Sequence, residues 1–206
     1  MNKQNELLTE FKDAESFAQN YFNYLNQVFS KINIKEIVSL INILIDARQR
    51  GAHIFFMGNG GSASTASHFA NDIAIGTRSW DKPFRATSLT DNQSMVTAIA
   101  NDDGYKNIFI QQLQVLMARG DVVVAISASG NSENILRAVE HANNCGGVTV
   151  GITAFDGGKL QKEVQHYVHI PTKKGEYGPA EDSHMAINHL VGAYIKHHVK
   201  SEPLNC

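Results

Sequence analysis

A loop rich in hydroxyl groups follows an apolar run in the second half of the chain. The run over 121–126 leads into Ser127-Ala128-Ser129-Gly130-Asn131-Ser132, and a helical pattern begins directly after it. The N-terminus of a helix presents unpaired N–H groups and a partial positive charge, so this loop can bind phosphate without lysine or arginine. Serine and asparagine also serve simply as helix caps. The density of hydrogen-bond donors in this short loop favours a phosphate site.

A glycine-rich turn occupies the corresponding place after an earlier apolar run. Residues 53–57 precede Gly58-Asn59-Gly60-Gly61-Ser62, and a helix-compatible stretch over 63–74 follows. The spacing lacks G-x-G-x-x-G, and the turn does not end in glycine-lysine-serine, so it matches neither the dinucleotide fingerprint nor the ATP-type phosphate loop. The turn therefore argues against a nucleotide as the ligand.

Two pairs of titratable side chains lie on predicted helices. His68 and Asp72 are four residues apart, so they project from one helix face. Glu181 and His189 lie about two turns apart on a last helix predicted over about 181–199, and they are expected to share a face as well. Together the pairs would offer two imidazoles and two carboxylates, a set suited to zinc. Each residue alone is more often a surface or core side chain, so the prediction depends on the conjunction.

Apolar runs followed by turns and helical patterns recur along the chain. Besides the two runs already named, strands are expected over 86–89, 148–153 and 167–171. Continuous β-branched runs indicate strands buried on both faces, and their alternation with helices indicates a parallel sheet. The expected fold is α/β, a three-layer sandwich with a five-stranded parallel sheet flanked by helices. Residues 7–50 predict two amphipathic helices, which pack either on another copy or on the chain's own sheet.

Length and composition indicate a single domain over 1–206, with a helical arm over 1–50, expected to serve oligomerisation, and an α/β core over 51–206. The net charge of -2 gives no broad attraction for nucleic acid or for an anionic membrane. No apolar run approaches the roughly 20 residues of a membrane-spanning helix. The N-terminal residues lack the apolar core of a signal peptide, and two cysteines, Cys145 and Cys206, are too few for a disulfide framework. A cytoplasmic location is expected.

Three motifs together resemble the sugar isomerase (SIS) domain family, and most of all its phosphoheptose isomerases. They are the glycine-rich turn, the serine loop and Asp156-Gly157-Gly158. The resemblance implies a homotetramer with active sites shared between subunits. It also implies an aldose–ketose isomerase that converts sedoheptulose 7-phosphate to D-glycero-D-manno-heptose 7-phosphate through an enediolate, at the start of bacterial heptose synthesis for cell-surface polysaccharide.

The resemblance also assigns roles to particular residues. It implies that the phosphate is contacted by Ser62, Ser127, Ser129 and Ser132, and that Asn59 lies near the sugar chain. The substrate pocket would be completed by Gly60, Gly61, Asp91, Asn101, Asp102, Ala128, Asn131 and Glu181. One zinc ion per subunit would be held by His68, Asp72, Glu181 and His189. Asp72 is the preferred candidate for the base that moves the proton, with Glu181 as the other candidate, and His189 is the candidate acid.

The chain departs from the pattern of the phosphoheptose isomerases at three positions. It has Asp72 where they usually have glutamate, Glu181 where they usually have glutamine, and Ala128 where they usually have threonine. An alternative function is that of a non-catalytic SIS-domain protein that binds a partner such as a replication initiator, and a third is that of a sugar-phosphate-sensing regulator. The presence of both Asp72 and His189 favours the enzyme, and no DNA-binding segment or basic patch supports a regulator.

Overall fold

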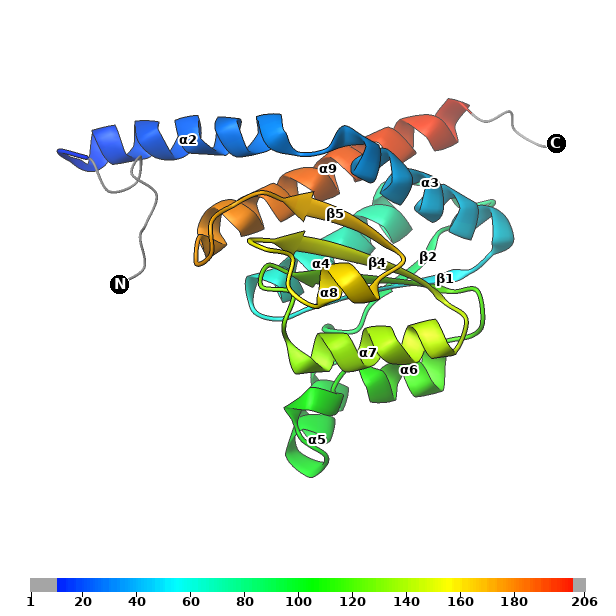
Figure 1. Ribbon diagram of the computed structural model, residues 1–206. Helices are drawn as coiled ribbons and strands as arrows, with labels where there is room; N and C mark the ends of the chain where they lie inside the picture. Colours follow the sequence, from blue (N-terminus) through cyan, green and yellow to red (C-terminus); the bar gives the residue numbers. More distant parts are fainter. Residues whose placement is uncertain (1–10, 202–206) are drawn as a thin grey trace.

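Five parallel strands form the centre of the molecule in the computed structural model, which describes residues 11–201 (Figure 1). The strands lie in the order β2-β1-β3-β4-β5. The predicted parallel sheet is confirmed. Residues 7–10 of the first predicted helix, and Cys206, lie outside the described residues. The strands are β1 (His53–Gly58), β2 (Arg85–Ser88), β3 (Val122–Ser127), β4 (Val148–Ala154) and β5 (His166–Ile170).

Alternate residues of the central strands enter two separate hydrophobic cores. In β1, Ile54 and Phe56 join one core while Phe55 and Met57 join the other, and all four are fully buried. The register sets Phe55 beside Val123 of β3, which belongs to the same core as Phe55. Because helices cover both faces of the sheet, the central strands can be apolar at every position.

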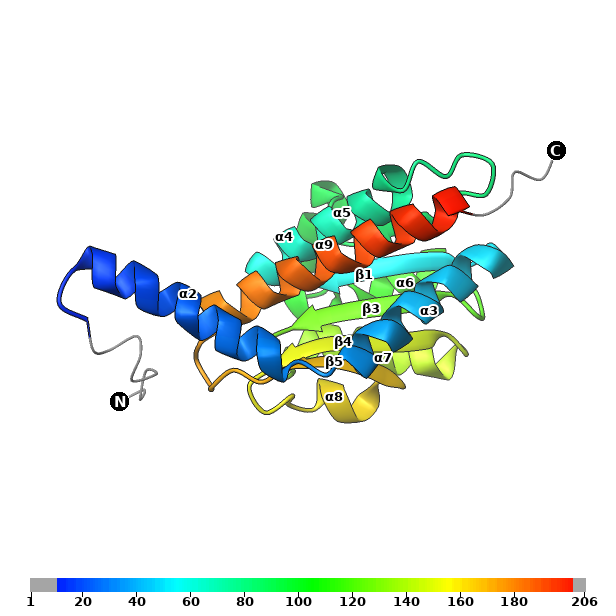
Figure 2. The ribbon, with the colours of Figure 1, turned by 90° about the horizontal axis from the view of Figure 1, so that it is seen from above.

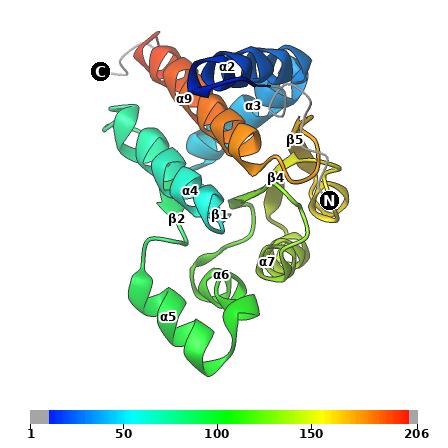
Figure 3. The same ribbon diagram turned by 90° about the vertical axis from the view of Figure 1, so that its left-hand side faces the viewer.

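Helices form a layer on each face of the sheet, as Figures 2 and 3 show. The three-layer arrangement is therefore confirmed. One layer contains α3 (Ile34–Arg50), α4 (Gly61–Asn71) and α9 (Tyr177–Ser201). The other contains α6 (Ile110–Leu116), α7 (Glu133–Asn144) and α8 (Leu160–Glu163), with α5 (Gln93–Asp102) beyond it.

Several helical segments differ from the expectation. Helix α5, the short 3-10 helix η2 (Tyr105–Asn107) and α6 occupy a stretch for which the sequence predicted no helix. None of the residues of α5, all of which the structure describes, is buried, and Val96, Ile99 and Ala100 pack only partly against the core. Helix α9 begins at Tyr177, four residues before the predicted start, because Pro179 lies in its first turn, where a missing N–H costs nothing.

The helical arm begins with α2 (Ala14–Lys31), which extends past the edge of the sheet (Figure 2). Asp13 caps α2 by accepting a hydrogen bond of 2.8 Å from the backbone N–H of Ser16. Two tyrosines attach α2 to the beginning of α9: Tyr21 donates to Asp182 at 2.5 Å, and Tyr24 donates to Glu176. No helix within residues 11–201 is both long enough and apolar enough to cross a membrane.

A buried histidine on α9 makes the stability of the fold depend on pH. His184 is fully buried, neither ring nitrogen has a partner within residues 11–201, and burial lowers its pKa to about 4. The folded-state pKa lies below the unfolded value of about 6.5, so the folded protein binds fewer protons. Stability is therefore present above about pH 6.5 and is lost as the pH falls towards about 4.

We expect the free energy of unfolding to fall by about 3 kcal/mol between pH 7 and pH 4 because of His184. His184→Leu should remove this part of the pH dependence, as measured by urea unfolding across the range. His197→Leu, at an exposed position of the same helix, is the matched control and should keep it. An unchanged slope in His184→Leu would show that His184 is not the group responsible.

Candidate active site

The serine loop forms one wall of a small cavity at the carboxyl ends of the strands. Ser127 ends β3, and α7 begins at Glu133. The cavity has a volume of about 150 Å³, and none of the described residues that line it is lysine or arginine. Backbone N–H groups at the starts of α4 and α7, with serine hydroxyls, are the donors available to an anion here. The lining residues are Asn59, Ser62, Ile126, Ser127, Ala128, Ser129, Ser132, Tyr177 and Glu181.

The serine hydroxyls that line the cavity differ in their hydrogen bonds within the loop. The hydroxyl of Ser127 accepts a hydrogen bond of 3.1 Å from the N–H of Gly130. Ser132 occupies the N-cap position of α7, yet within the described chain its side chain makes no capping hydrogen bond. Simple capping therefore does not account for the Ser132 hydroxyl, which is left for a ligand of the cavity that Ser132 lines.

Asn131 has a structural position rather than a place in the cavity wall. Its amide donates to the carbonyl of Ser129 at 2.7 Å and accepts from the N–H of Lys159 at 3.2 Å. Gly130 has φ +61, and a Cβ there would lie 2.1 Å from the carbonyl oxygen of Gly157. The serine loop and the Asp156-Gly157-Gly158 turn are therefore packed backbone against backbone. This contact gives a physical reason for the glycines of both motifs.

The glycine-rich turn reaches the cavity through Asn59 and Ser62. Asn59 exchanges two hydrogen bonds of 2.9 Å with the buried amide of Asn134, and it accepts a third from the hydroxyl of Tyr105 at 2.9 Å. These contacts hold the turn against α7 and η2. Gly61 begins α4 so close to Glu181 that a Cβ there would lie 2.2 Å from the carboxylate.

Glu181 lies in the serine-loop cavity and is separated from the other three predicted metal ligands. It lines the cavity with Tyr177, whereas His68, Asp72 and His189 form a cluster without it. The reason is helical geometry: His189 lies about 12 Å from Glu181 along the helix axis. Within residues 11–201 of one chain, the structure therefore brings together three of the four predicted ligands, and Glu181 is not among them.

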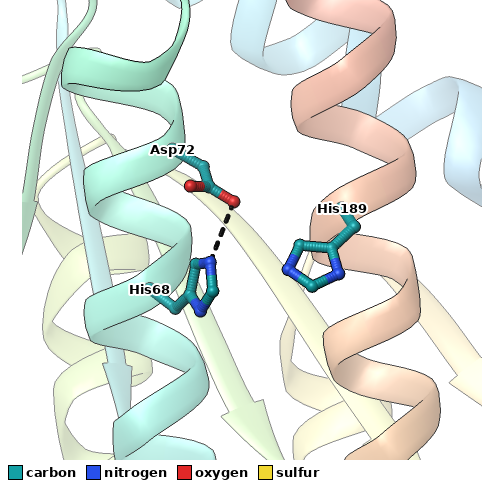
Figure 4. A group of neighbouring side chains, drawn as sticks. All are labelled: His68, Asp72 and His189. Atoms are coloured by element: carbon teal, nitrogen blue, oxygen red, sulfur yellow. Dashed lines mark ion pairs between the residues drawn. The ribbon is translucent and has the colours of Figure 1, made fainter.

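His68, Asp72 and His189 come together between α4 and α9 (Figure 4). Nε2 of His68 lies 3.3 Å from Oδ2 of Asp72, and the two imidazole rings lie 5.0 Å apart, edge to face. His68 lies in the last turn of α4, and Asp72 begins the π-helix η1 (Asp72–Gly76) that continues it. His189 approaches from α9. Irregular turns of this kind are frequent at functional sites.

The donor set of this cluster fits a divalent metal ion. One ligand atom from each of the three residues lies within 4.8 Å of the others. Two imidazoles and a carboxylate are ligand types that zinc accepts, and catalytic zinc sites use three protein ligands with one position open. The side chains of His68 and Asp72 are partly exposed, at 42% and 25%, so an ion and a substrate can reach them.

A second cavity, of about 250 Å³, adjoins Asp72 and His189. Gly76, Gly192 and Ala193 line it, and their small size leaves the space open. Lys196 lies at its edge, one turn of α9 beyond Gly192. The cluster therefore has room beside it for part of a ligand.

Three predicted pocket residues lie apart from both cavities. Asp91 accepts hydrogen bonds from the hydroxyls of Ser67 and Thr90, and it thereby connects the end of β2 to α4. Asn101 and Asp102 lie at the exposed end of α5 and are hydrogen-bonded to each other at 2.7 Å. Figure 3 shows α5 on the opposite side of the sheet from α9. Within residues 11–201 of one chain, these side chains do not line the candidate site.

Residues 17–154 match the SIS domain family, a stretch that includes α4 and the serine loop. The chain belongs to this family. It is 34% identical to the phosphoheptose isomerase of Aneurinibacillus thermoaerophilus over 83% of this chain and 91% of that protein. It is 37% identical to the phosphoheptose isomerase of Geobacter metallireducens, over 75% of this chain and 81% of that protein. Both the family and the isomerase class predicted from the sequence are confirmed.

A solved structure shares the architecture of this SIS-domain chain. The phosphoheptose isomerase of Neisseria gonorrhoeae superposes with a TM-score of 0.81 and 27% identity, covering 90% of this chain and 100% of that chain. The likeness therefore extends beyond the matched family region and includes most of the chain.

Sequence reasoning missed four residues that shape the site: Tyr105, Asn134, Tyr177 and Asn188. Tyr105 and Asn134 hold Asn59, Tyr177 lines the serine-loop cavity, and Asn188 donates to Asp72. Asn134 follows the serine loop by two residues, and Asn188 precedes His189. For Asn134 and Asn188, this adjacency to a predicted site was the only signal available.

We expect Gly130→Ala to destabilise the fold more than Gly51→Ala. Both glycines have positive φ, but a Cβ at Gly51 meets no atom within 4 Å, whereas one at Gly130 meets the carbonyl of Gly157. Gly51→Ala should cost about 1 kcal/mol of unfolding free energy from its backbone conformation. Gly130→Ala should cost about 1–3 kcal/mol more. Urea unfolding measures both losses. Equal losses would show that the serine loop and the Asp156-Gly157-Gly158 turn can move apart without a cost in stability.

Proposed function

We propose that this chain, a sugar-phosphate isomerase, converts sedoheptulose 7-phosphate to D-glycero-D-manno-heptose 7-phosphate. One observation carries the proposal: α9 connects an anion-type cavity to a His–Asp–His cluster. Glu181 lies in the cavity and His189 in the cluster, about 12 Å apart along the helix. With its phosphate in the cavity, a triose phosphate is too short for its reacting carbons to reach the cluster. The distance between cavity and cluster therefore favours a longer sugar.

The serine-loop cavity anchors the phosphate. Its hydroxyls and helix N-termini are neutral donors, and they bind the dianion without a cation beside it. Glu181 accepts hydrogen bonds from sugar hydroxyls at the inner side of the same cavity. Binding energy from this remote group orients the reacting carbons for proton transfer.

Asp72 and His189 carry out the proton transfers. Asp72 removes a proton from C1 of the ketose while His189 gives a proton to the carbonyl oxygen at C2, which forms the enediolate system. Asp72 then returns the proton to C2, the C1 hydroxyl loses its proton to His189, and the C1 aldehyde forms. A divalent metal ion held by His68, Asp72 and His189 would polarise the carbonyl and the neighbouring hydroxyl.

The assembly proposed for the active enzyme is a homotetramer, with one zinc ion per subunit. Support comes from α2, where Phe17, Phe22 and Phe29 expose 38%, 65% and 37% of their surface. Large apolar side chains grouped on one helix favour contact with another protein surface. We place the enzyme in the cytoplasm, at the start of heptose synthesis for cell-surface polysaccharide. The relatives' name, phosphoheptose isomerase, supports the heptose phosphate as substrate.

Asp72→Asn should lower kcat at least about 100-fold on sedoheptulose 7-phosphate, because the amide cannot accept the proton. The melting temperature should stay close to that of the wild type. Asp81→Asn, at an exposed loop position, is the matched control and should keep full activity. Product formation is followed by chromatography of the aldose phosphate. If wild-type protein does not convert this sugar, with or without added zinc, the proposal is wrong.

Ser129→Ala should lower kcat/KM about tenfold, because one hydrogen bond to a charged phosphate is lost. The competitive inhibition constant of inorganic phosphate should rise by a similar factor, since phosphate uses the same donors. Ser64→Ala removes an exposed hydroxyl from the first turn of α4 and serves as the control. Equal inhibition constants for the two variants would contradict a phosphate site at the serine loop.

A further inference from the structure

Asn188 is a fully buried polar residue on α9, directly behind Asp72. Its side-chain amide donates a hydrogen bond of 3.2 Å to Oδ2 of Asp72. Its other contact is weak, with the sulfur of Met185 at 3.6 Å. The amide oxygen is buried and has no hydrogen-bond partner within residues 11–201. The only strong polar interaction of Asn188 in the described chain is therefore the one with Asp72.

The charge of Asp72 decides which way the Asn188 amide points. An ionised carboxylate only accepts hydrogen bonds, so the NH₂ end must face it. The reversed amide would place two oxygens against each other. The orientation that satisfies Asp72 is also the one that leaves the amide oxygen unpaired, and an unpaired buried acceptor costs about 1–3 kcal/mol.

Stability alone does not explain an asparagine at this position. Ile187 and Val191, which flank Asn188 on α9, are buried in the core formed with α4. A leucine of similar size would pack there without an unpaired oxygen, and Asp72, whose side chain is 25% exposed, could take water in place of the lost amide. Asn188 thus destabilises the fold through its unpaired oxygen, and its hydrogen bond serves only the Asp72 carboxylate within the described chain.

The two oxygens of Asp72 have different surroundings. Oδ2 lies between the Asn188 amide at 3.2 Å and Nε2 of His68 at 3.3 Å. Within the described part of the chain, Oδ1 has only the exposed amide of the neighbouring Asn71, at 3.5 Å. Rotation of the carboxylate would break the contact with Asn188. Asn188 therefore fixes which oxygen stays within the protein and which one remains available.

We propose that Asn188 is a positioning residue that holds the Asp72 carboxylate in the orientation needed for metal binding and proton transfer. The inference rests on the proposed function of the site. Groups that hold a metal ligand through a hydrogen bond typically change metal affinity or activity by about 10–100-fold when removed. Asn188 acts on the reaction only through Asp72.

The test compares Asn188→Leu with Ser183→Ala. Leucine removes the hydrogen bond to Asp72 while filling a similar volume. Ser183 is equally buried on the same helix and donates to the carbonyl of Pro179 at 2.7 Å, away from Asp72. Four quantities are measured on each purified full-length protein: kcat and KM for sedoheptulose 7-phosphate, the zinc dissociation constant by calorimetry, the melting temperature, and the Asp72 orientation by crystallography.

Asn188→Leu should lower kcat and zinc affinity by about tenfold or more, with KM changed less than about threefold. Its melting temperature should equal or exceed that of the wild type, and Asp72 should be turned in its crystal structure. Ser183→Ala should lose stability but keep kcat and zinc affinity. Asn188→Ser restores a donor and should recover part of the loss.

Two results would overturn the inference. One is a kcat and a zinc affinity in Asn188→Leu within about twofold of the wild type. The other is a loss of activity that follows a loss of melting temperature, as it would for a purely structural residue. If wild-type protein neither turns over the sugar nor binds zinc, the proposed function fails. The Asp72 orientation in the variant still decides the inference in that case, because an unchanged carboxylate rejects it.

Discussion

The packing of α9 against α4 is the contact on which the site depends. Helix α4 begins at the serine-loop cavity and ends at His68 and Asp72, and α9 runs alongside it from Tyr177 to beyond His189. A glycine permits this close approach at one end, since a Cβ at Gly61 would lie 2.2 Å from Glu181, whereas a Cβ at Gly192 would make only an ordinary contact with Asp72. The two helices thus connect the serine-loop cavity with the His–Asp–His cluster. Each of them contributes residues to both places.

The electrostatics of the cavity follow from its lack of basic side chains. A phosphate there would be held by helix N-termini and hydroxyls, which are fixed by the fold. Glu181 places a negative charge in the same cavity, next to the first residue of α4. The positive end of the helix dipole stabilises that charge, so phosphate and carboxylate compete for the same partial charges.

The predictability of each feature depended on the range of the interactions that form it. The strands, the two loops and the His68–Asp72 pair come from local patterns, and the structure has them as expected. The approach of His189 to His68 and Asp72 depends on helix packing. The sequence predicted this approach only through the family resemblance. Periodicity alone failed for Glu181, because an offset of about two turns also separates it from His189 by about 12 Å along the axis. Helix α5 was missed although Val96, Ile99 and Ala100, which pack partly against the core, have helical spacing.

The buried face of α9 contains polar residues that do not stabilise the fold by packing. Ser183, His184 and Asn188 are all fully buried on a helix that otherwise presents Ile187, Val191 and Ile195 to the core. Ser183 satisfies its own helix backbone, but His184 and the oxygen of Asn188 have no partner within residues 11–201. Unpaired buried polar atoms cost free energy, so packing alone disfavours such a helix. For Asn188 the contact with Asp72 provides the compensation. On the proposal made above, the orientation of the Asp72 carboxylate is set from inside the core, by a residue that is itself fully buried.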